Sequence, residues 1–254
     1  MRNNTFLRNA IALSTVLFFS ACEHLQDVEQ TGINHVVQVD ISGSALHDLP
    51  DHAAAIEARL LRHLGAKDRL VVLPIDHASL THVKPMFELD MASKNFEDPS
   101  MPITTRKAMA DHARGEYLQR VSAGFKDRLA KAAEERQDNR KYTDIFGALR
   151  QAAQEVREGR SNQLWLLCDM LHESESMNMD RLQRAGKPLE GVRNQAPRIE
   201  LPFDRVLIFT GDNSKLGGKR FAELESFWKR WFSDQGLTVG IYASGGIRNE
   251  MVQR

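Results

Sequence analysis

Hydrophobic and polar positions alternate along the chain in a pattern that predicts an α/β fold. Short apolar runs bounded by turn residues, as expected for strands, alternate with longer segments whose apolar residues recur at helical spacing. Such alternation is typical of a mainly parallel sheet with helices on both faces. The predicted strands are residues 36–41, 70–75, 86–91, 164–169, 206–210 and 237–242, and the predicted helices are residues 50–64, 105–136, 143–152 and 219–232.

The first 22 residues have the features of a processing signal. An apolar run over residues 10–19 follows a short basic segment and ends in small residues. This run is shorter than the roughly 20 residues that a membrane-spanning helix needs. The Phe-Ser-Ala-Cys motif that ends at Cys22 resembles the lipobox of bacterial lipoproteins, in which the cysteine is lipidated, although Phe19 stands where Leu is usual. Ordinary cleavage after Ala21 is the alternative.

A lipidated Cys22 predicts a protein anchored in the bacterial cell envelope. Residues 23–34 would form a polar tether, residues 35–242 one α/β domain and residues 243–254 a tail. Glu23 is not the Asp that is associated with inner-membrane retention, which favours the outer membrane, facing the periplasm. The second cysteine, Cys168, lies in an apolar run and is expected to be a core residue.

Net charge limits the kinds of partner. Thirty-four basic and thirty-four acidic residues give a formal net charge of zero, so no global field favours nucleic acid or an anionic membrane surface. Electrostatic recognition is therefore expected to be local.

Oxygen-bearing side chains gather where the first predicted strand ends. Asp40, Ser42 and Ser44 alternate along one turn, and Gly43 lets the backbone fold tightly there. Hard divalent cations such as Mg²⁺ are bound by a few protein oxygens together with water. The turn is a candidate metal site, although Asp and Ser also shape turns and cap helices without a metal.

Two further residues make this turn resemble the metal-ion-dependent adhesion site of the von Willebrand factor type A (vWA) family. That site combines an Asp-x-Ser-x-Ser loop with a distant Thr and a more distant Asp. The chain has Asp40, Ser42 and Ser44 in the loop, then Thr143 before a helix and Asp169 at the end of a strand. The resemblance implies that these five residues bind one Mg²⁺ or Mn²⁺.

The resemblance covers roughly residues 34–242 and implies a three-layer, doubly wound, mainly parallel sheet with one antiparallel edge strand. In a sheet of order 3-2-1-4-5-6, the first and fourth strands are neighbours at the switch point, where open α/β sheets bind ligands. With residues 86–91 as the antiparallel third strand, Asp40 and Asp169 would emerge side by side at the carboxyl edge. Two separate loops would then converge on one ion.

The function that the resemblance implies is metal-dependent protein binding, without catalysis. One coordination position of the ion stays open, and a Glu or Asp carboxylate of a partner protein completes it. Asp40 and Asp169 would supply charge directly or through water, and Ser42 and Ser44 would be direct ligands. Thr143 would contact the ion directly or through water.

The chain departs from the family pattern after Asp169, where Met170 replaces the usual Gly. Its side chain would crowd the metal face or offer an apolar contact to a partner. A long loop over residues 170–201 then begins, and its residues His172, Glu173 and Glu175 would shape specificity or bind a second cation. Solvated loop charge is the simpler interpretation of these three residues.

Two other function classes stay open. A metal-dependent hydrolase would use Asp40 or Ser42 as a nucleophile, but no base can be assigned beside Ser42 and the chain has no Gly-x-Ser-x-Gly elbow. A metal-independent envelope scaffold would use the helical stretch over residues 105–136 as its interaction surface. A zinc site at His77 and His82 would lack the further ligands that zinc needs.

Overall fold

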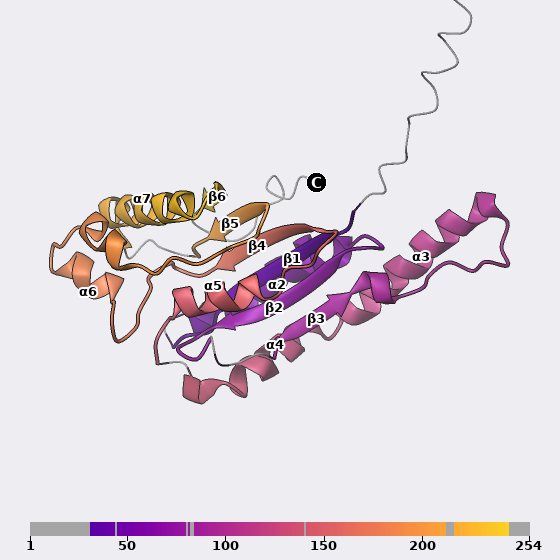
Figure 1. The fold of residues 1–254 in the computed structure, drawn as a ribbon. Coiled ribbons are helices and arrows are strands. Elements are labelled where there is room, and N and C mark those ends of the chain that lie inside the picture. Colours follow the sequence, from indigo (N-terminus) through magenta and orange to yellow (C-terminus); the bar gives the residue numbers. More distant parts are fainter. Residues whose placement is uncertain are drawn as a thin grey trace, which may run out of the picture. The chain divides into compact units, whose positions relative to one another are not determined.

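The computed structural model describes residues 31–43, 45–79, 81, 84–139, 141–211 and 216–243. A six-stranded sheet of order β3-β2-β1-β4-β5-β6 forms the middle of the fold (Figure 1). Neighbouring strands are parallel except β3, which pairs antiparallel with β2. The predicted fold class is therefore confirmed. The strands are β1 (Ile33–Asp40), β2 (Arg69–Ile75), β3 (Phe87–Asp90), β4 (Ser161–Leu167), β5 (Arg205–Phe209) and β6 (Val239–Ala243).

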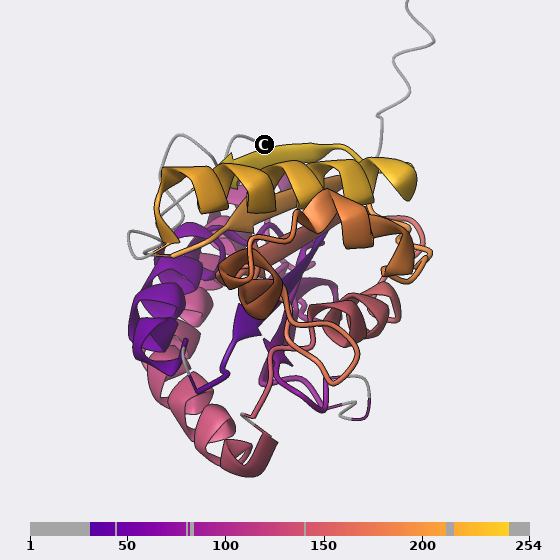
Figure 2. The same cartoon turned by 90° about the vertical axis from the view of Figure 1, so that its left-hand side faces the viewer.

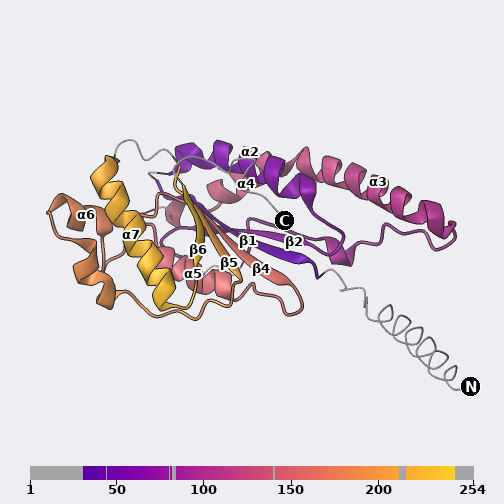
Figure 3. The same cartoon turned by 90° about the horizontal axis from the view of Figure 1, so that it is seen from above.

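Helices cover both faces of the sheet, as Figure 3 shows from above. One face carries α2 (Leu49–Arg59), α3 (Ile103–Ser122) and α4 (Phe125–Glu134), and the other carries α5 (Ile145–Ala153), α6 (Met179–Arg184) and α7 (Gly218–Asp234). Short 3₁₀ turns are η1 (Leu46–Asp48), η2 (Leu61–His63), η3 (Met91–Ser93), η4 (Gln137–Asn139) and η5 (Leu189–Gln195).

The apolar strand residues alternate between two hydrophobic cores. On β1, Val36 packs with α5 and α7, whereas Val37 and Val39 pack with α2 and α4. On β4, Leu164 packs in the core with α5 and α7, and Trp165 packs in the core with α2 and α4. Because successive side chains of a strand point to opposite faces, a strand covered on both sides is apolar at most of its positions. This explains the continuous apolar runs in the sequence.

Several predicted boundaries differ from the structure. The helical stretch over residues 105–136 is two helices, because the chain turns at Ala123 and Gly124 between α3 and α4. The stretch over residues 170–201 contains α6 and η5, and the Asn178 side chain starts α6 by accepting a hydrogen bond from Arg181 N at 2.7 Å. β1 begins at Ile33, inside the predicted tether.

The predicted signal, Cys22 and nearly all of the predicted tail lie outside the described residues. Within the described part of the chain, no helix has the length and apolarity needed to cross a membrane.

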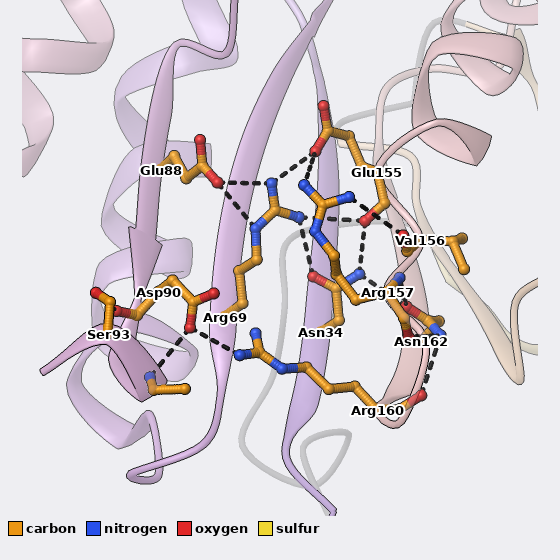
Figure 4. A network of polar contacts seen from close by, with 11 residues as sticks. Asn34, Arg69, Glu88, Asp90, Ser93, Glu155, Val156, Arg157, Arg160 and Asn162 are labelled. Carbon is orange, nitrogen blue, oxygen red and sulfur yellow. Dashed lines mark hydrogen bonds and ion pairs between the residues drawn. The ribbon is translucent and has the colours of Figure 1, made fainter.

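A polar network joins the amino ends of the strands (Figure 4). Arg69 on β2 is only 1% exposed, and its Nη2 lies 2.7 Å from a Glu88 carboxylate oxygen and 2.6 Å from a Glu155 carboxylate oxygen. Its Nη1 donates to the side-chain oxygen of Asn34 at 3.1 Å. These contacts tie β1, β2, β3 and the segment after α5 together. The network stabilises the amino edge of the sheet, opposite the edge where Asp40 ends β1.

Candidate metal centre

Asp40 and Asp169 leave neighbouring strands at the carboxyl edge of the sheet. β1 and β4 are parallel, with Val39 opposite Leu167. Asp40 is the last residue of β1, and Asp169 lies two residues beyond the end of β4 rather than in the strand. Figure 2 looks onto this edge, with α2, α5 and α7 around it. The two carboxyl groups therefore lie together, as the strand order led us to expect.

Asp40 has a carboxyl group that the described residues do not fully satisfy. The residue is 0% exposed, and its Oδ1 accepts a hydrogen bond from Ser42 N at 2.8 Å. Its Oδ2 is buried and has no hydrogen-bond partner among the described residues. Burial and, after it, the negative charge of Asp169 raise the pKa of Asp40 to about 7, although hydrogen bonds from the side chain and backbone of Ser42 oppose the shift. A buried polar atom without a partner costs about 1–3 kcal/mol.

Asp169 has a similar electrostatic environment. Its Oδ1 accepts a hydrogen bond from Leu171 N at 2.8 Å. Burial raises the pKa of Asp169 to about 6, although the Leu171 hydrogen bond opposes the shift and the charges of Asp180, Asp48 and Glu173 add to it. None of the described charges that set the pKa of Asp40 or Asp169 is positive. Among the described residues, no cation therefore opposes the raised pKa of either carboxyl group.

The neighbouring strand end provides a contrast. Asp76 follows β2 directly and is also 0% exposed, but both of its carboxylate oxygens have partners. Oδ1 accepts from Ala78 N at 2.9 Å, and Oδ2 accepts from Arg136 Nε at 2.9 Å. The fold thus supplies a guanidinium for the buried carboxylate of Asp76 and no comparable cation, among the described residues, for that of Asp40.

Ser42 and Thr143 are the hydroxyl residues of the motif that the structure describes. Ser42 is 3% exposed, and its carbonyl oxygen accepts from Ala45 N at 3.1 Å, which closes the turn after β1. Ser44 lies outside the described residues. Thr143 is 5% exposed, and its carbonyl oxygen accepts from Glu173 N at 2.9 Å. This hydrogen bond holds the Thr143 segment against the loop that follows Asp169.

A cavity of about 390 Å³ opens at this edge, and Thr143 and Asp169 are among its lining residues. Asp40 and Ser42 are buried and are not among its lining residues. The lining also includes residues that the sequence analysis missed: Asp48 in η1, Asp180 and Arg184 in α6, Thr210 after β5, and Arg220 in α7.

Two of these missed residues had a usable signal in the sequence, and one of them is Thr210, which directly follows β5. Asp48 stands just before α2, and a helix that follows a parallel strand begins at the carboxyl edge of the sheet. Arg184 and Arg220 had no such signal, because their position depends on how α6 packs against α7.

Met170 does not act as we expected from the sequence. Its side chain is 0% exposed and belongs to the core with α5 and α7, so it neither crowds the metal face nor offers a contact to a partner. Its φ of 63° lies in the left-handed region, which explains why Gly would suit this position. Cys168, 1% exposed, is a core residue as predicted.

His172 is a buried structural residue, so the interpretation as solvated loop charge is wrong for it. The residue is 3% exposed, its Nδ1 accepts from Ile145 N at 3.2 Å, and its ring lies 4.5 Å from that of Phe146. Burial lowers the pKa of His172 to about 4. The neutral imidazole therefore joins the Asp169 loop to the start of α5.

The two glutamates of the same loop lie nearer to solvent. Glu173 lines the cavity and accepts a hydrogen bond from Asn178 Nδ2 at 2.6 Å, whereas Glu175 is exposed.

Of the two histidines considered for a zinc site, His77 is exposed and His82 lies outside the described residues. In the described ranges, no three His, Cys, Asp or Glu side chains converge as a metal site. A metal at Asp40 and Asp169 would therefore depend on hydroxyl oxygens and water for its remaining ligands.

The sequence matches no protein-family model and no curated protein. The resemblance to the vWA family rests on the motif residues and on the strand order.

Proposed function

We propose that this protein is a vWA-type binding module that holds one Mg²⁺ or Mn²⁺ at the carboxyl edge of its sheet and captures an acidic group of a partner protein. The buried Oδ2 of Asp40, without a partner among the described residues and beside the second carboxyl group of Asp169, carries the proposal. A divalent cation would neutralise both carboxylates and occupy the acceptor that the fold leaves unused.

The chemistry of the donors favours a hard cation. Carboxylate and hydroxyl oxygens suit Mg²⁺ and Mn²⁺, whereas zinc prefers sulfur and imidazole nitrogen. The nearby soft donors are not suitable, because the thiol of Cys168 is buried and the Nδ1 of His172 accepts the hydrogen bond from Ile145 N.

In this proposal, Asp40 and Asp169 supply charge, and Ser42, Ser44 and Thr143 supply neutral oxygens directly or through water. The cavity lets a partner's Glu or Asp side chain approach Asp169 and Thr143. A lipid on Cys22 would anchor the domain through the amino end of β1.

One observation favours the metal-independent scaffold as the second candidate. Ile103, 80% exposed, and Met109, 48% exposed, are the exposed large hydrophobic residues of the described chain, and both lie on α3. Figures 1 and 3 show the first half of α3 extending away from the sheet. Such a helix would offer a protein-binding surface that needs no metal.

The experiment compares capture of envelope proteins by the immobilised full-length protein in Mg²⁺ and in EDTA. We expect capture to need Mg²⁺, to be lost in Asp40→Asn and to persist in Asp76→Asn. Asp76 is the control because both of its carboxylate oxygens already accept hydrogen bonds from the described residues. Capture that survives EDTA and Asp40→Asn, but falls when Lys107 on α3 is changed to Glu, would support the scaffold and overturn the metal-dependent function.

A further inference from the structure

The cavity lining combines two groups of opposite charge. The acidic group comes from the segments that follow β1 and β4 and includes Asp48 and Asp169, with Asp40 buried beside them. The basic group is Arg184 on α6 and Arg220 on α7. A ligand in this cavity therefore meets the cation position and two guanidinium groups within one space of about 390 Å³.

The two guanidinium groups share one carboxylate of the described chain. Arg220 Nη2 lies 2.5 Å from Asp180 Oδ1, and Arg184 Nε lies 2.7 Å from Asp180 Oδ2. Arg220 Nε also donates to Gln183 Oε1 at 3.2 Å. Two positive charges against one negative charge leave a net positive charge on this part of the lining. Because a guanidinium has five N–H donors, most donors of both arginines stay available for an anionic group.

Solvent exposure shows which of the two arginines a ligand reaches more easily. The Arg184 side chain is 72% exposed and that of Arg220 is 29% exposed. Arg184 is therefore able to reorient toward a ligand, whereas Arg220 is held between Asp180 and Gln183. The pair combines one fixed and one adaptable donor group.

Building on the proposed metal site, we propose that the cavity recognises a segment with two carboxylates, one of which completes the coordination of the cation while the other binds Arg184 and Arg220. A single carboxylate on the cation would leave unused the N–H donors of Arg184 and Arg220 that do not contact Asp180. The volume lies in the range of pockets that hold small molecules, and an Arg pair suits a carboxylate because the fork of N–H donors matches its two oxygens.

The test uses two capped peptides, acetyl-Glu-Gly-Glu-amide and acetyl-Glu-Gly-Gln-amide, which differ in one carboxylate. Ligand-observed NMR with the full-length protein in Mg²⁺ would give both dissociation constants. We expect the diacidic peptide to bind roughly fivefold more tightly, a difference typical of one partly exposed ion pair.

The exposed Arg184→Gln should reduce this preference without affecting the fold, and Arg184→Gln with Arg220→Gln should remove it. Arg181→Gln is the matched control, because Arg181 is exposed on the same helix and does not line the cavity.

The outcomes separate this inference from the function on which it rests. Equal, Mg²⁺-dependent binding of both peptides, or a preference that survives both arginine substitutions, would overturn the diacid proposal and leave the metal site standing. A preference for the diacidic peptide that persists in EDTA would show that the arginines act without the cation. This result would also contradict the diacid proposal. Failure of both peptides to bind in Mg²⁺ would overturn both proposals.

Discussion

Trp228 on α7 donates a hydrogen bond from its indole Nε1 to the carbonyl oxygen of Met170 at 2.8 Å. Met170 directly follows Asp169 and has a φ of 63°, a conformation that is unfavourable for a residue with a side chain. The buried indole therefore helps to hold the strained backbone that positions one of the two carboxylates of the proposed site. Packing between α7 and the sheet and the geometry of the site are linked through this contact.

Trp228→Phe should lower the free energy of unfolding by about 1–3 kcal/mol, because the buried Met170 carbonyl loses its donor. It should also weaken Mg²⁺ binding severalfold, because the Asp169 loop is less constrained. Chemical denaturation and calorimetry measure the two effects. Trp231→Phe is the control, since Trp231 is also buried and donates to Pro197 O at 3.2 Å, away from Asp169. Equal loss of Mg²⁺ affinity in both variants would contradict the link.

Asp40→Asn and Asp76→Asn should affect the metal-free protein in opposite ways. The pKa of Asp40 is raised to about 7 in the folded protein, so its ionisation favours the unfolded state. Stability is therefore lost as the pH rises from about 4 to about 7, by on the order of a few kcal/mol. Asp40→Asn should remove this loss, so the variant should be at least as stable as the wild type at pH 8.

Asp76→Asn should instead destabilise by about 1–3 kcal/mol at pH 8, because it weakens the contact with Arg136. Denaturant unfolding in EDTA from pH 4 to pH 8 measures both variants. A large destabilisation by Asp40→Asn would mean that the fold itself compensates the Asp40 charge, and the case for a cation at this strand end would fail.

His172 should produce a pH dependence of the opposite sign. Burial lowers its pKa to about 4, and the Asp144 carboxylate 3.9 Å away does not reverse that shift. Below the ordinary His pKa of about 6.5 the unfolded chain binds a proton that the folded protein does not. Stability should therefore fall as the pH drops from about 6.5 to about 4. His172→Asn, which keeps an acceptor for Ile145 N, should flatten the profile over this window, and an unchanged profile would argue against a buried neutral imidazole.

The Arg69 network should contribute to stability without contributing to the metal site. Arg69→Met should lower the free energy of unfolding by roughly 2–4 kcal/mol, because it leaves buried acceptors on Asn34 and Glu155 without their donor. Arg157→Met, a more exposed member of the network with one longer contact to Glu155, should change it by less than about 1 kcal/mol. Mg²⁺ affinity, measured for both folded variants, should stay at the wild-type value.

The strands could be predicted because burial on both faces imposes a local pattern, whereas their order followed from the resemblance to the vWA family. Most residues of β1, β2 and β4 are apolar because these strands are covered on both faces. The break at Gly124 and the start of α6 at Asn178 were missed, because each depends on short-range backbone geometry within a longer amphipathic or polar stretch.

The site was predictable only as far as its residues follow strand ends. Asp40 and Asp169 could be placed from the sheet order, whereas the left-handed backbone at Met170 has no sequence signal except the absence of the expected Gly. The neutral state of His172 follows from its packing under α5, and the position of Arg184 and Arg220 follows from the contact between α6 and α7. Such tertiary contacts cannot be read from spacing along the chain.

Calorimetric titration of the full-length protein with Mg²⁺ and Mn²⁺, for the wild type, Asp40→Asn and Asp76→Asn, tests the central claim most directly. The proposed metal centre predicts one ion per chain in the wild type and in Asp76→Asn and none in Asp40→Asn, with circular dichroism showing all three folded. Wild-type affinity should rise as the pH increases from about 5.5 to 8, because Asp40 must lose its proton to bind the ion. Wild-type affinity in a folded Asp40→Asn, or no binding by the wild type at pH 8, would contradict a metal centre at Asp40 and Asp169.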